Sequence, residues 1–148
     1  MTPLQLAFYV VMVLNILWFS MAFHYFSLKA QSAARMLVSK PQRESPLFDT
    51  VVYSVRFLGG MNFAFAFLSL LLLLNTGGFT AMQQAWLAFA LAVAHASQFC
   101  FNVPLALGRG GMPESDQPGL AGPMRMIFVV DGTLMLANAV LGLWLFVG

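Results

Sequence analysis

Four long apolar stretches alternate with shorter polar segments along the chain. The apolar stretches run from about Leu4 to Leu28, Val51 to Leu74, Phe79 to Val103 and Met124 to Val147. Each has at least the roughly 20 residues that a helix needs to cross the hydrocarbon core of a bilayer. Uninterrupted apolar runs such as Leu70 to Leu74 lack the alternation that strands of a membrane β-barrel require. The pattern therefore predicts four transmembrane helices.

The composition supports the same interpretation. Of the 148 residues, 60% are hydrophobic and 8% are charged, whereas a soluble domain has roughly 25% charged residues. This balance excludes an ordinary soluble domain and leaves too little polar surface for a nucleic-acid binder. We expect one all-α domain over residues 1–148, an integral membrane four-helix bundle with up-down-up-down topology and polar loops at 29–50 and 104–123. The lipid bilayer is its first partner.

The basic residues are distributed unevenly between the two ends of the predicted bundle. Those in or beside the two long loops are Lys29, Arg35, Lys40, Arg43, Arg109 and Arg125. Arg56 lies near the same end, whereas the 75–78 turn and both termini have no basic residue. By the positive-inside rule, the long loops are cytoplasmic and both termini lie on the non-cytoplasmic side. We expect a protein of a bacterial cytoplasmic membrane.

Several strongly polar residues fall inside the apolar stretches, where lipid makes them costly. Counting helix rise from the cytoplasmic ends sorts them into two layers. The layer nearer the cytoplasm contains His24, Arg56, Gln98, Asn102 and Asp131. The layer near mid-membrane contains Asn15, Asn62, His95 and Asn138. These residues are the candidates for a polar core or a ligand site.

Arg56 and Asp131 carry opposite charges at similar predicted depths, which differ by roughly 3 Å by helix rise. Because a charge near the bilayer centre costs at least about 2.5 kcal/mol on insertion scales, we expect both to face inward and to pair. The pair either clamps the second helix to the fourth or forms the charged floor of a cavity that opens toward the cytoplasmic leaflet. In such a cavity, Arg56 would hold a polar or anionic headgroup, or Asp131 would exchange a proton.

His95, Gln98 and Asn102 recur at i, i+3 and i+7 and therefore share one face of the third helix. This polar stripe indicates hydrogen bonds between helices or, alternatively, a row of functional groups. The two histidines, His24 and His95, lie at different depths, and no third histidine or carboxylate cluster accompanies them. We therefore expect no haem, metal or other cofactor.

The run Arg56-Phe57-Leu58-Gly59, followed by His95 in the middle of the next helix, resembles the four-helix proteins of the ergosterol-biosynthesis scaffold family. The resemblance covers the second and third helices. It implies a scaffold or accessory role in the endoplasmic reticulum, where such proteins tether sterol-modifying enzymes. The family tends to carry an acidic residue soon after the histidine, whereas this chain has Gln98.

Three functions fit these observations. The first is a non-catalytic scaffold or accessory subunit with a membrane-protein partner, which is favoured because the chain shows no set of nucleophile, base and orienting residue. The second is a binder, carrier or enzyme for a lipid or small amphiphile in a polar cavity of the inner leaflet. The third is a channel or proton-coupled transporter, which would require a homo-oligomer because 148 residues form only one four-helix bundle.

Overall fold

A computed structural model describes residues 1–107 and 123–148. Four long helices dominate this part of the chain, namely α1 (Pro3–Phe23), α3 (Leu47–Leu74), α4 (Ala81–Ala106) and α5 (Pro123–Val147). Each belongs to a segment that is long and apolar enough to cross a membrane. The all-α bundle of four apolar helices predicted from the sequence is therefore confirmed.

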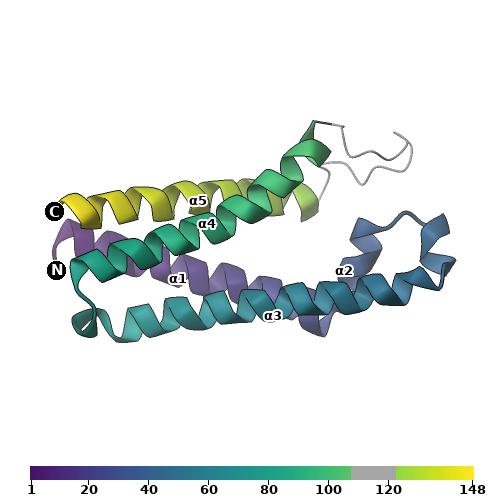
Figure 1. Cartoon of the computed structure of the whole chain (residues 1–148), viewed down its shortest axis with the longest axis horizontal. Coiled ribbons are helices and arrows are strands. Elements are labelled where there is room, and N and C mark those ends of the chain that lie inside the picture. Colours follow the sequence, from purple (N-terminus) through teal and green to yellow (C-terminus); the bar gives the residue numbers. More distant parts are fainter. Residues whose placement is uncertain (108–122) are drawn as a thin grey trace.

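The long helices pack side by side, and both termini lie at one end of the bundle (Figure 1). The short η3 (Thr76–Gly78), which joins α3 to α4, lies at this end too, and we call it the terminal end. At the opposite end, the loop end, α1 and α4 finish while α3 and α5 begin. α1 packs along α3, α4 packs along α5, and α1 also contacts α5. The main apolar core contains Phe8, Met12, Phe19, Ala66, Leu72, Ala85, Ala88, Leu91, Ala94, Leu141 and Leu145.

The segment after α1 consists of short helical pieces. The π-helix η1 (His24–Leu28) is followed by α2 (Ala30–Leu37), which packs on α3, and by η2 (Pro41–Glu44). α2 and the start of α3 form a second, smaller core of Ala30, Ala33, Ala34, Phe48, Val52 and Val55. The polar loop expected at 29–50 is thus largely helical, because its alanines and Phe48 bury an apolar face.

Several helix ends differ from their predicted positions, and two of these differences have a clear physical reason. α3 begins at Leu47 rather than Val51, since Phe48 is buried in the smaller core beside α2. α4 continues through Pro104 to Ala106, although the sequence predicted that this helix ends at Val103. Proline lacks a backbone N–H and disrupts the preceding turn, but Pro104 lies so close to the end of α4 that only the last turn is affected.

η1 passes close to α3 at Gly59. A Cβ atom at this position would collide with Ser27 Oγ and lie 2.6 Å from the Ser27 nitrogen. Ser27 Oγ also donates a 3.0 Å hydrogen bond to the backbone carbonyl of Arg56. The contact between η1 and α3 therefore depends on two features of the run from Arg56 to Gly59. Gly59 has no side chain and lets the backbones approach, and the backbone carbonyl of Arg56 accepts a hydrogen bond. The Arg56 guanidinium takes no part in this contact.

Candidate functional site

Six polar side chains of the described residues are buried in the bundle. Each is at most 1% exposed, and they are Asn15, Asn62, Ser69, His95, Asp131 and Asn138. Four of them join with Trp18 in one hydrogen-bonded network that links α1, α4 and α5. We call Asn15, Trp18, His95, Asp131 and Asn138 the core network. Burying polar groups costs free energy unless they are hydrogen-bonded, and the network meets most of that requirement.

Asp131 links α1 and α4 through a single oxygen atom. Its Oδ1 accepts a 2.8 Å hydrogen bond from Trp18 Nε1 and lies 2.9 Å from His95 Nδ1. Its Oδ2 is buried and has no hydrogen-bond partner among the described residues. The two layers predicted from the sequence therefore merge, because His95 and Asp131 are in direct contact.

The orientation of two amides places a proton on His95. Asn138 Nδ2 donates to the carbonyl of Leu134 at 2.8 Å, which fixes the side of the amide on which this nitrogen lies. Asn138 Oδ1 then accepts from Asn15 Nδ2 at 2.8 Å. Asn15 Oδ1 consequently faces His95 Nε2 at 2.9 Å. Because an amide oxygen only accepts hydrogen bonds, His95 Nε2 carries a proton.

His95 has no ring nitrogen left for contact with a ligand. Nε2 is bonded to Asn15, Nδ1 lies 2.9 Å from Asp131 Oδ1, and the ring stacks on Phe19 at a centroid distance of 4.5 Å. A proton held between Nδ1 and Oδ1 would make the His95–Asp131 pair net neutral, whichever atom carries it. A net neutral pair suits an apolar membrane interior. Asp131 Oδ2 is the remaining acid–base atom of the core network.

The expected ion pair between Arg56 and Asp131 is wrong. Asp131 pairs with His95 instead, while Arg56 is exposed on α3, with its guanidinium carbon 5.7 Å from the centroid of the Tyr53 ring. α3 has 28 residues, whereas about 20 cross the hydrocarbon core. Counting from its Leu74 end therefore places Arg56 at the edge of that core. From there the guanidinium reaches the headgroup region and needs no buried partner.

The other predicted site residues divide between the interior and the surface. Asn62 is buried and accepts a long, 3.4 Å hydrogen bond from Gln98 Nε2. Asn102 is half-buried and donates to the carbonyl of Gln98 in its own helix at 2.8 Å. His24 is exposed at the start of η1. His95, Gln98 and Asn102 thus have separate partners, and His24 lies outside the core network.

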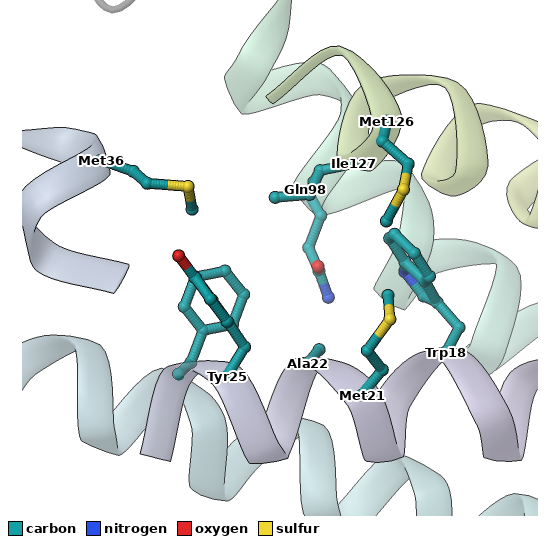
Figure 2. Close-up of a pocket in the computed structure, with 9 residues that line it drawn as sticks. Trp18, Met21, Ala22, Tyr25, Met36, Gln98, Met126 and Ile127 are labelled. Carbon is teal, nitrogen blue, oxygen red and sulfur yellow. The ribbon is translucent and has the colours of Figure 1, made fainter. Parts of the chain in front are cut away.

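A cavity of about 170 Å³ lies beside the core network toward the loop end (Figure 2). Its described lining residues are Trp18, Met21, Ala22, Tyr25, Phe26, Met36, Gln98, Met126 and Ile127. We call this space the loop-end cavity. Figure 2 shows the Gln98 amide between the rings of Tyr25 and Trp18, with the Tyr25 hydroxyl directed toward Met36. Trp18 belongs to both features, since its ring lines the cavity and its Nε1 bonds Asp131.

The loop-end cavity differs from the predicted inner-leaflet cavity. None of its described lining residues is charged, so the expected floor of Arg56 and Asp131 is not found there. Of the site residues predicted from the sequence, Gln98 is the one that lines it. The cavity is therefore an apolar space with a small polar component.

The sequence interpretation missed most residues that line the cavity, among them Trp18, Tyr25 and Met36. Trp18 follows Asn15 by three residues and so shares its helix face, a spacing that could have identified it. Met36 had no comparable signal, because its position depends on how α2 folds back.

Comparisons with protein-family models, curated proteins and solved structures find no match for this chain. The fold and its four apolar helices define a multi-pass membrane protein. Over residues 1–107 and 123–148, no three His, Cys, Asp or Glu side chains are grouped to hold a metal ion. The function is therefore argued from the core network and the loop-end cavity.

Proposed function

We propose that this protein binds one part of a small amphiphile in the loop-end cavity. The proposal is carried by an apolar concave lining that contains two polar atoms, Tyr25 Oη and Gln98 Oε1, neither of which is hydrogen-bonded to a described residue. Binding sites for small molecules typically combine apolar walls with a few polar groups that fix orientation. The flexible thioethers of Met21, Met36 and Met126 suit such a site because they adapt to the shape of a ligand.

The size of the cavity limits which part of a ligand it takes. Its volume of about 170 Å³ is well below the roughly 300–1,000 Å³ of pockets that enclose whole drug-sized molecules. The cavity therefore accommodates a headgroup or a short segment. The rest of the ligand remains in contact with lipid.

Native mass spectrometry of protein released from nanodiscs tests this proposal. Ala22→Phe fills the cavity from α1, whereas Ala64→Phe adds the same ring to an exposed position on α3. We expect Ala22→Phe to lose an amphiphile that wild type and Ala64→Phe retain. Equal retention by the three proteins, each with a wild-type melting temperature, would exclude the cavity as the binding site. Wild type that retains no amphiphile would also argue against it.

The charge distribution supports an orientation with the loop end in the cytoplasm of a bacterial cell. The basic residues at this end of the described structure are Lys29, Arg35, Lys40, Arg43, Arg56 and Arg125. In a Cys100→Ser background, a membrane-impermeant maleimide added to intact cells should label Thr2→Cys and spare Gln42→Cys. The opposite labelling pattern would reverse the orientation.

The scaffold role remains a prediction, as does the likeness to the ergosterol-biosynthesis scaffold family with its location in the endoplasmic reticulum. Exposed apolar side chains occur on all four long helices, as a lipid environment requires, so no surface formed by residues 1–107 and 123–148 singles out a protein partner. Co-purification from native membranes in mild detergent is the relevant measurement. A protein that purifies alone would argue against the scaffold role.

A further inference from the structure

A second concavity adjoins the loop-end cavity along the outside of the bundle. It has a volume of about 320 Å³ and is lined by Leu14, Leu17, Trp18, Met21, Val130, Thr133 and Leu134. We call it the α1–α5 groove. Trp18 and Met21 line both spaces. These two side chains therefore form a common wall of the groove and the cavity.

The two spaces together define the chemical class of the ligand. Resting on the proposed function, we infer that the ligand is a neutral-headed amphiphile with one long apolar tail. The head lies in the loop-end cavity, and the tail follows the α1–α5 groove toward the terminal end.

The polarity of the linings assigns the two ends of the ligand. In the groove, the Thr133 hydroxyl already donates to the carbonyl of Val129 at 2.8 Å, and Trp18 Nε1 already donates to Asp131. The remaining described lining of the groove is hydrocarbon and thioether, which suits an apolar chain. The cavity instead presents the Tyr25 hydroxyl and the Gln98 carboxamide. Both groups donate and accept hydrogen bonds, so they suit a hydroxyl or carbonyl head.

The described linings favour a neutral head over an ionised one. None of the described residues that line the cavity or the groove is charged. Burying an ionised group without a partner is strongly unfavourable. Lys29, Arg35 and Arg56 are exposed on the outside of the protein and do not line either space. An anionic lipid would therefore bind at that surface rather than in the cavity.

The groove also explains how a ligand reaches the cavity. Leu14, Leu17 and Met21 are between 44% and 62% exposed, so this side of α1 faces the surrounding lipid. A tail can enter the groove sideways from the bilayer without passing through water. The α1–α5 groove shares Trp18 and Met21 with the cavity and offers a place for one tail, which favours a ligand with a single tail.

Quenching of Trp18 fluorescence by brominated lipid tails tests this inference. The chain has three tryptophans, and Trp86 and Trp144 are exposed, so Trp86→Phe with Trp144→Phe leaves Trp18 as the reporter. The protein is placed in phosphatidylcholine nanodiscs and titrated with three probes that carry the same brominated acyl chain. These are a monoacylglycerol, a lysophosphatidic acid and a diacylglycerol. A second protein, which keeps only Trp86, reports general partitioning into the bilayer.

We expect saturable quenching of Trp18 by the monoacylglycerol and at least about tenfold weaker binding of the other two probes. Trp86 should respond to all three probes alike and without saturation. Equal binding of the lysophosphatidic acid would overturn the neutral head. Equal binding of the diacylglycerol would overturn the single tail.

Two replacements separate this inference from the proposed function on which it rests. Ala22→Phe fills the cavity, Thr133→Phe fills the groove, and Leu136→Phe is a control at an exposed position of α5. The first two should each weaken binding of the monoacylglycerol at least about tenfold, and the control should not. Loss in Ala22→Phe with full binding in Thr133→Phe would overturn the tail position and leave the proposed function standing. Saturable quenching that neither replacement changes would overturn both.

Discussion

The indole of Trp18 donates a 2.8 Å hydrogen bond to Asp131 Oδ1, and the same ring forms a wall of the loop-end cavity. Because His95 Nδ1 contacts this oxygen at 2.9 Å, the position of the indole depends on side chains of both α4 and α5. The core network therefore shapes the cavity that we propose as the ligand site. Changes in the network should alter stability and ligand binding together.

Removing one member of the His95–Asp131 pair should destabilise the protein strongly. His95→Leu and Asp131→Leu each leave a buried ionisable group without its partner, which costs about 3–5 kcal/mol. The double replacement removes both groups and should cost clearly less than the sum of the single replacements. It should not be neutral, because Trp18 Nε1 loses its acceptor at about 1–3 kcal/mol, whereas Asn15 Oδ1 keeps the 3.0 Å hydrogen bond from Asn138 Nδ2. Equilibrium unfolding in mixed micelles with SDS measures these free energies.

Ser69→Ala provides the control for this comparison. The Ser69 hydroxyl is equally buried, but its bond goes to the Phe65 carbonyl in the same helix. Its loss should cost no more than about 0.6 kcal/mol, the average for side-chain hydrogen bonds between helices of a membrane bundle. Additive effects of the His95 and Asp131 replacements would contradict the pairing.

The amide arrangement predicts the tautomer of His95. The chain has two histidines, so His24→Gln leaves His95 as the single source of imidazole signals in nitrogen-15 NMR. We expect a protonated Nε2, because Asn15 Oδ1 accepts its hydrogen bond. Asn138→Leu removes the group that orients Asn15 and should change the Nε2 signal. An Nε2 without a proton in the parent protein would show that both amides are turned the other way.

The membrane bundle could be predicted because the lipid environment allows only a few backbone structures. Each apolar stretch must satisfy its own backbone as a helix, and polar residues within such stretches tend to face the interior. This reasoning identified Asn15, Asn62, His95, Asp131 and Asn138 as candidates, and all five are buried. The same reasoning was wrong for His24 and Arg56, which also fall inside apolar stretches but are exposed.

The partners of these residues could not be predicted because helix rise gives depth and not rotation. Arg56 and Asp131 lie at similar depths, yet Arg56 is on an exposed face of α3 while Asp131 faces α1 and α4. The loop-end cavity could not be predicted from the sequence for a different reason. Met36 lines it only because α2 packs on α3, where Phe48 contributes to their shared core, a long-range contact that local patterning does not encode.

Gly59→Ala should destabilise the contact between η1 and α3. The added Cβ would lie 2.6 Å from the Ser27 backbone nitrogen, so the backbones would have to separate. Overpacking of this kind costs about 1–3 kcal/mol. Gly60→Ala is the matched control, since nothing lies within 4 Å of a Cβ there. It should leave stability unchanged or raise it by up to about 1 kcal/mol through helix propensity. Equal thermal stability of the two variants would contradict the close approach.

Arg56→Ala should change stability little, in contrast to replacements of Asp131. The guanidinium is exposed and lies over the Tyr53 ring, a contact worth about 0.5–1 kcal/mol at exposed sites. Because Arg56 and Asp131 share no partner, the effects of Arg56→Ala and Asp131→Leu should add within about 0.5 kcal/mol. A double-mutant cycle from SDS unfolding measures the coupling between them. A coupling energy above about 1 kcal/mol would mean that the two charges interact, and Arg56 would then have to turn inward from the exposed face of α3.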